Sequence, residues 1–182
     1  NPGSRVVLHL EAGTYTIDDT IYIPPYATIV GAGSEKTVIK TTSSITEMFK
    51  TVNSSSTPGA PADKSTTTTL NQATNVQIKG ITLETTLSNK GLVLDCCKDS
   101  VFEDIQIKGA WVRGNAFNTD VGIEHNNLSL VSSVVETKNN NFKNIKVNGF
   151  TYAVSSDWDT NNHSWTDCNF YNLGYGTAFG TN

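Results

Sequence analysis

The stretch that decides the fold is Phe102-Glu103-Asp104-Ile105-Gln106-Ile107, in which an apolar residue, a polar residue and an aspartate precede an apolar–polar–apolar triplet. Residues 78–83, 142–147 and 165–170 repeat this order, with Gly, Asn or Asp in the third place. The triplet alternates with a period of two, which indicates a β-strand with one buried face. Gly, Asp and Asn best tolerate a left-handed backbone, so one of them bends a strand without a loop.

The spacing between these repeats is that of a solenoid. Ile81 and Ile105 are 24 residues apart, and Ile145 and Cys168 are 23 apart, which is typical of one solenoid turn. Ile105 and Ile145 are 40 residues apart, which indicates either one coil with a long insertion or two irregular coils. Leucine-rich repeats share the period, but their leucine and asparagine framework is absent and the β-branched and aromatic residues favour strands. We therefore predict an all-β fold, a right-handed parallel β-helix with loop insertions.

Stacking the repeats predicts one column of bends and three columns of apolar side chains. The bend column contains Gly80, Asp104, Asn144 and Asp167, and the apolar columns contain Ile78, Phe102, Phe142 and Trp165, then Ile81, Ile105, Ile145 and Cys168, then Leu83, Ile107, Val147 and Phe170. Asp104 and Asp167 are therefore assigned to structure rather than to chemistry, and Trp165 to the core.

Composition excludes several classes of function. The chain has 182 residues, which suits one domain, and its net charge is −4 with no cluster of Lys or Arg, so nucleic-acid binding through phosphates is not expected. No run of 18 apolar residues is present, so no membrane insertion is expected.

Cofactor and metal motifs are also missing. The three cysteines, Cys96, Cys97 and Cys168, have no metal-binding spacing and are interpreted as small buried hydrophobes. Gly31-Ala32-Gly33 lacks the lysine of a phosphate-binding loop and is interpreted as a turn between coils. We expect no cofactor and no metal.

The N-terminal part carries a family resemblance. Short strands over residues 6–42 are separated by Ala12-Gly13-Thr14-Tyr15, by Ile23-Pro24 and by Gly31-Ala32-Gly33. This order resembles the opening coils of the pectate-lyase-like single-stranded right-handed β-helix superfamily, in particular its phage tailspike-like branch. The superfamily includes phage tailspikes and polysaccharide-degrading enzymes.

The resemblance implies two alternative functions, and an extracellular bacterial adhesin is a third option. The first is a viral tailspike-like or tail-fibre-like structural protein, in the virion or extracellular, that binds a polysaccharide or receptor on the host surface. Its expected partners are two further copies, in a homotrimer, or other virion proteins. The second is a polysaccharide-degrading hydrolase or lyase.

Two insertions are expected in a single domain. Residues 1–182 are interpreted as one β-helix domain, a fragment of a longer chain. Residues 53–72 have no apolar face and indicate a solvated loop or an arm that contacts a partner or a glycan. Residues 112–140 form a second, irregular insertion.

The best catalytic candidates are Asp157 and Asp159, which lie two residues apart and would share one face of a strand. Paired carboxylates of this kind carry out glycoside hydrolysis. The alternative is that residues 155–162 form a polar turn between coils. His163 follows the pair, and Trp158 lies between its members.

A second acidic group combines Asp120 and Glu124 with His125, in the irregular stretch where a β-helix would build the wall of a groove. Trp111 and Trp158 lie outside the apolar columns, so we expect them to be exposed and able to stack on sugar rings. Ligand binding is therefore predicted for Trp111, Trp158, His163, Asp120 and Glu124.

Overall fold

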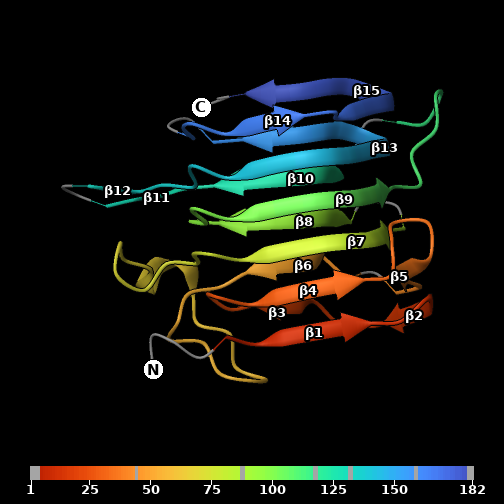
Figure 1. Ribbon diagram of the computed structural model, residues 1–182. Helices are drawn as coiled ribbons and strands as arrows, with labels where there is room; N and C mark the ends of the chain where they lie inside the picture. Colours follow the sequence, from red (N-terminus) through yellow and green to blue (C-terminus); the bar gives the residue numbers. More distant parts are fainter. Residues whose placement is uncertain are drawn as a thin grey trace.

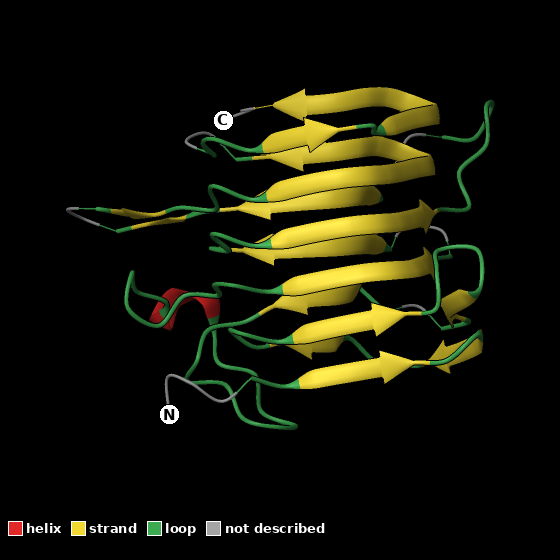
Figure 2. Ribbon diagram, in the orientation of Figure 1, coloured by secondary structure: helices red, strands yellow, loops and turns green. Residues whose placement is uncertain are grey.

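The computed structural model describes residues 5–43, 45–86, 89–116, 119–130, 133–157 and 160–179, with side chains up to residue 175. Over this part the chain winds into a right-handed parallel β-helix whose coils stack from one end of the molecule to the other (Figure 1). Nearly all of the regular structure is strand, and one short 3₁₀ helix, Lys64–Thr66, lies in a side arm (Figure 2).

Each complete coil contributes strand residues to three faces, which we name A, B and C. Face A consists of β1 (Val7–Leu10), β4 (Thr28–Gly31), the first parts of β7 (Gln77–Glu84), β9 (Val101–Lys108) and β13 (Asn141–Ser156), and β14 (Ser164–Thr166). Face B consists of β2 (Gly13–Ile17), β5 (Thr37–Thr41), the later parts of β7 and β9, the middle of β13 and the start of β15 (Asn169–Phe179). Face C consists of β3 (Ile21–Ile23), β6 (Glu47–Thr51), β8 (Lys90–Asp95), β10 (Val121–Asn126) and the ends of β13 and β15.

The bend column between faces A and B is confirmed. Gly80, Asp104, Asn144 and Asp167 all have a left-handed backbone, with φ of 68°, 52°, 51° and 55°. Asp104 also accepts hydrogen bonds from the backbone N–H and the hydroxyl of Ser34, at 3.1 and 2.8 Å. A residue predicted to be structural therefore ties the loop after β4 to the stack.

The apolar columns are confirmed as well. Ile78, Phe102, Phe142 and Trp165 pair in register on face A, and the rings of Phe102, Phe142 and Trp165 stack at centroid distances of 5.1 and 4.0 Å. Ile105 pairs directly with Ile145, so the 40-residue gap is one coil with an insertion.

The two insertions differ in structure. Strand β10 lies inside residues 112–140 and completes a coil, while β11 (Leu128–Ser129) and β12 (Val134–Val135) form an antiparallel hairpin that leaves the stack. Residues 53–72 contain no strand among those described and form the arm with the 3₁₀ helix.

A second bend column precedes face A and was not predicted. Asn75, Asp99, Asn139 and Asn162 are left-handed, with φ between 51° and 57°. The residues that directly follow these four form a ladder of hydrogen bonds. In it, the backbone N–H of one residue donates to the side chain of the corresponding residue in the next coil. Its bonds run from Val76 to Ser100 Oγ, from Ser100 to Asn140 Oδ1 and from Asn140 to His163 Nδ1, at 3.0, 3.1 and 3.3 Å.

The three cysteines are free, and the prediction that they are buried is confirmed for two of them. Cys96 and Cys97 are buried and Cys168 is half-buried. Burial raises the pKa of both Cys96 and Cys97 to about 12, so these thiols stay protonated and unreactive at neutral pH. Among the described residues, no helix has both the length and the apolar character needed to cross a membrane.

Gly149 lies where the backbones of two neighbouring coils approach each other closely. Its φ is 74°, and an added Cβ would collide with the carbonyl oxygen of Gly109 in the preceding coil. Gly59 has a similar φ of 76° with open space around it, so Gly59→Ala carries the backbone strain alone, about 1–2 kcal/mol. We expect Gly149→Ala to lower the free energy of unfolding by about 1–3 kcal/mol more than Gly59→Ala, because the backbones must move apart. Urea denaturation measures both, and equal losses would contradict the close approach.

Candidate functional site

Face C carries a row of charged and polar side chains on its outward side. Inward positions of the same strands hold core residues such as Phe49, Leu92 and Ile123, which pair in register. Side chains alternate along a strand, so Lys50, Asp95, Glu124 and Asn126, which lie an odd number of residues from these core positions, point away from the core. Ion pairs add Glu47 to Lys50 and Lys90 to Glu124, and we name these six residues the charged strip. Glu47 and Asp95 are largely buried within it, with exposed fractions of 9% and 8%.

Asn126 brings two carboxylates together. Its Nδ2 donates to Asp95 Oδ1 at 2.8 Å and to Glu124 Oε2 at 3.1 Å. The two acceptor oxygens can thus be no further apart than about 6 Å, and pairs about 5–10 Å apart carry out glycoside hydrolysis. This upper limit includes the spacing of about 5–5.5 Å that retaining glycosidases use.

Two lysines balance the charge of these acids. Lys90 Nζ contacts both oxygens of Glu124, at 2.7 and 2.8 Å. Lys50 Nζ lies 2.8 Å from Glu47 Oε1 and 3.6 Å from Asp95 Oδ2. Burial opposes the charge on Lys50, but the hydrogen bond to Glu47 and the attraction of Asp95 outweigh it and raise the pKa of Lys50. The Lys50 ammonium therefore stays protonated at neutral pH.

A cavity of about 310 Å³ lies where the strip meets the arm. Tyr22, Lys50 and Asp95 line it from face C, and Asp63 and Lys64 are among the arm residues that line it. The arm and the β11–β12 hairpin project from the side of the molecule where the strands of face C end (Figure 1). One of the paired carboxylates, Asp95, is thus reached from a pocket with an aromatic side chain in its wall.

The arm is held in place by its own polar contacts. The Asn53 amide donates to the hydroxyls of Thr66 and Thr67, both at 3.1 Å. The Asp63 carboxylate caps the 3₁₀ helix by accepting the N–H of Ser65 at 2.7 Å. The wall of the cavity is therefore preorganised.

Of the two predicted catalytic residues, only Asp157 falls within the described part of the chain. Ser156 pairs with His125, so Asp157 follows on the strand next to Asn126 and lies beside the charged strip. It is exposed, and its Oδ2 accepts the N–H of Asn127 at 2.9 Å. Asp159 and Trp158 lie outside the described residues.

The predicted acidic group is divided between surface and interior. Glu124 belongs to the charged strip. Asp120 is fully buried, and its Oδ1 accepts the N–H of Thr151 at 3.1 Å, which is a structural contact. His163 lies away from the strip, at the end of the side-chain ladder, with its ring centroid 4.6 Å from that of His125.

The expectation that Trp111 is exposed is wrong, since its exposed fraction is 4%. The backbone N–H of Trp111 donates to the carbonyl of Gly149 at 2.8 Å, and its backbone carbonyl accepts from the side-chain amide of Asn172 at 3.4 Å. These contacts fold the segment after β9 against the later coils and cover the indole.

Sequence reasoning missed Asp95 and its lysine neighbours. Lys90 is the first residue of β8 and Asp95 is the last, so in the sequence both look like polar residues that merely flank an apolar strand. The usable signal was in β10: His125 faces inward, so Glu124 and Asn126 on either side of it must face outward. No group of three or more His, Cys, Asp or Glu side chains in the described residues has a metal-binding arrangement.

Comparison with known proteins gives a family match over nearly the whole chain. The family model described as "Rhamnogalacturonase A/epimerase, pectate lyase-like" matches residues 3–178. Among solved structures, ORF18 of Geobacillus virus E2 aligns with 19% identity and a TM-score of 0.41. That alignment covers 89% of this chain and 34% of ORF18, so the chain spans about a third of that protein's length. No curated protein matches.

Proposed function

The chain belongs to the rhamnogalacturonase A/epimerase, pectate-lyase-like family, and from this membership we propose that it is a carbohydrate-active enzyme that hydrolyses a polysaccharide on face C. The observation that carries the proposal is the pair Asp95 and Glu124, held about 6 Å apart or less by the amide of Asn126. The tailspike function, the homotrimer and the virion location expected from the sequence stay predictions.

The contacts of the pair favour different roles for its two members. Glu124 has a lysine on both of its oxygens and is the carboxylate that acts in its charged form, as nucleophile or base. Asp95 lines the cavity, so it is the member of the pair that a sugar bound there would contact. Tyr22 in the same wall offers a ring for the apolar face of a sugar.

Hydrolysis fits the site better than β-elimination by a lyase. A lyase needs a base to remove a carbon-bound proton, and a lysine serves as one only when its pKa is lowered. The pKa of Lys50 is raised, because Glu47 and Asp95 outweigh the effect of burial, and Lys90 is paired with Glu124. The lysines of the strip therefore orient and neutralise carboxylates instead of accepting protons.

The direct test is to incubate the chain with a panel of neutral and acidic polysaccharides. We expect new reducing ends and shortened oligosaccharides on at least one of them, without the ultraviolet absorbance of the unsaturated sugar that a lyase produces. A panel with no new reducing ends would contradict the proposal, and unsaturated products would replace hydrolysis by elimination.

Asp157 provides a test of how the roles are divided. It lies at the rim, next to the strand of Asn126, and its carboxylate already accepts the N–H of Asn127. We expect Asp157→Asn to lower kcat/KM by about tenfold or less, through weaker sugar binding, since an amide keeps the acceptor oxygen. Steady-state kinetics on the cleaved polysaccharide measures this. A loss of kcat/KM as large as that of Asp95→Asn would instead make Asp157 a member of the catalytic pair.

A further inference from the structure

Tyr175 is the most exposed of the described aromatic side chains, with an exposed fraction of 59%. Its ring stacks on that of Tyr152, with centroids 5.4 Å apart and planes 17° from parallel. Stacking of this kind fixes the orientation of a ring that would otherwise rotate. Tyr175 is therefore accessible to a ligand and is held in orientation by Tyr152.

The tyrosine pair continues the row of the charged strip. Tyr152 pairs with Val121, Val121 with Lys90, and Lys90 with Glu47, which forms one line across face C. Glu124 pairs with Ser155, three residues along β13 from Tyr152, so the pair lies about 10 Å along the strand direction from the proposed catalytic glutamate. That distance is longer than one sugar ring, so contact with Tyr175 requires a chain of several sugars.

A cavity that is lined by Gly174, the residue before Tyr175, adds hydrogen-bonding groups. Trp111, Arg113 and Asn115 line it from the segment after β9, and Asn172 and Gly174 line it from β15, with a volume of about 630 Å³. This volume is within the range of about 300–1,000 Å³ that small-molecule sites occupy. The guanidinium and the amides can donate to sugar hydroxyls while the ring is stacked.

We propose that Tyr175, Tyr152 and the adjoining cavity form a second saccharide subsite, which holds a polysaccharide chain several sugars away from Asp95 and Glu124. The ligand class is an extended polysaccharide rather than a monosaccharide or a short oligosaccharide. This inference rests on the proposed function for the direction of the chain along face C, but the subsite binds sugar whether or not cleavage occurs.

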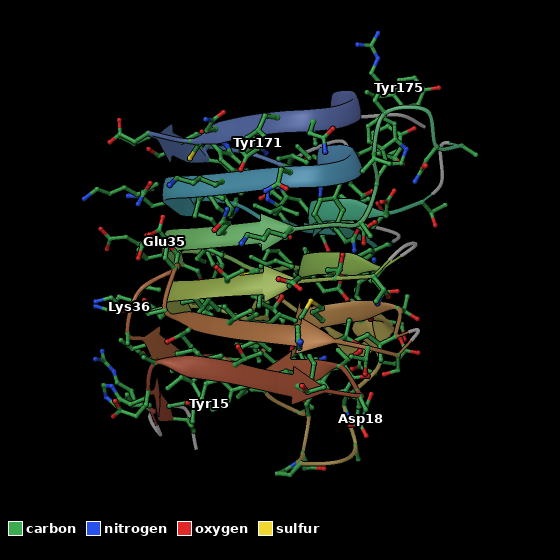
Figure 3. The ribbon with its side chains drawn as sticks, turned by 90° about the vertical axis from the view of Figure 1, so that its right-hand side faces the viewer. Tyr15, Asp18, Glu35, Lys36, Tyr171 and Tyr175 are labelled. Atoms are coloured by element: carbon green, nitrogen blue, oxygen red, sulfur yellow. The ribbon has the colours of Figure 1, made fainter. Side chains whose placement is uncertain are left out.

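The test is binding measured without cleavage. In the Glu124→Gln background, each panel polysaccharide is embedded in a native gel and the retardation of the protein is measured. We expect Tyr175→Ala to weaken binding about tenfold and Tyr175→Phe to leave it unchanged, because the ring and not the hydroxyl makes the contact. Tyr171→Ala is the matched control: Tyr171 is on the same strand with an exposed fraction of 44%, but it lies over the sheet, apart from Tyr175 (Figure 3).

The outcomes separate the subsite from the catalytic proposal. Weaker binding in Tyr175→Ala alone supports the subsite even if wild-type protein cleaves nothing, in which case only the catalytic proposal fails. Equal retardation in Tyr175→Ala, Tyr171→Ala and the unsubstituted background overturns the subsite, even if the wild type cleaves. In active protein, Tyr175→Ala should raise KM for the polysaccharide about tenfold. It should leave kcat/KM unchanged for oligosaccharides too short to reach Tyr175. An equal effect on both substrates also overturns the subsite.

Discussion

Glu124→Gln is expected to lower kcat on the cleaved polysaccharide by about 10²–10⁴-fold, the range that a positioned acid or base contributes. The amide keeps the size of the side chain and an acceptor for Lys90, but it can neither attack a sugar nor accept a proton. Asp95→Asn should produce a loss of the same order, because both carboxylates act on one bond. Initial rates of reducing-end formation measure both variants.

The control for this loss is Glu103→Gln. Glu103 is an acidic residue of face A whose carboxylate lies 3.2 Å from Lys143, so it reproduces the loss of an ion pair away from face C. It should keep wild-type kcat. If Glu124→Gln also kept wild-type kcat while unfolding at the same denaturant concentration, the carboxylate pair would not be the catalytic site.

The interior of the fold could be predicted from the sequence because bend residues and core residues recur at fixed positions in each coil. A left-handed bend favours Gly, Asn or Asp, and the core demands apolar side chains at fixed offsets, so Gly80, Asp104, Asn144 and Asp167 identify their own positions. The second bend column escaped notice because the residues that follow Asn75, Asp99, Asn139 and Asn162 have no common type. They share only a ladder of hydrogen bonds, which links backbone donors to Ser100, Asn140 and His163.

The candidate site was predicted only in part because it depends on register between coils. Asp95 and Glu124 are 29 positions apart in sequence, and only the pairing of β8 with β10 brings them to one amide. The adjacent pair Asp157 and Asp159 was more visible in sequence because its members are two residues apart. Local spacing finds neighbours along a strand, whereas a β-helix also builds sites from neighbours across strands.

Of the two histidines of the later coils, His125 is packed inside the fold and His163 is half-buried. His125 is fully buried, with its Nδ1 3.0 Å from the hydroxyl of Ser156, and its ring contacts that of Phe142 at 5.5 Å. His163 lies beside it, and Trp165 flanks the same group. Burial, and in second place the proximity of His163, lower the pKa of His125 to about 3, and burial lowers the pKa of His163 as well.

These shifts predict that the protein loses stability as the pH falls below about 6.5. A histidine whose pKa is lower in the folded state than in the unfolded chain, where it is about 6.5, binds its proton preferentially in the unfolded state. The stabilising effect is complete above pH 6.5 and disappears gradually as the pH falls toward the folded value. Between pH 6.5 and 5, before most carboxylates titrate, His125 alone should lower the free energy of unfolding by about 2 kcal/mol.

Removing the buried imidazole should flatten this dependence. Leu94 occupies the position paired with His125 in the neighbouring coil, so His125→Leu fits the column and eliminates the titrating group. Urea denaturation at pH 7, 6 and 5 should show a smaller decrease for His125→Leu than for wild type, while His9→Asn, on an exposed position of β1, should follow the wild type. The quantity compared is the change of the free energy of unfolding with pH. Losing the contact with Ser156 lowers that free energy equally at each pH, so it does not affect the comparison. Equal slopes in His125→Leu and wild type would show that the buried histidine does not control acid stability.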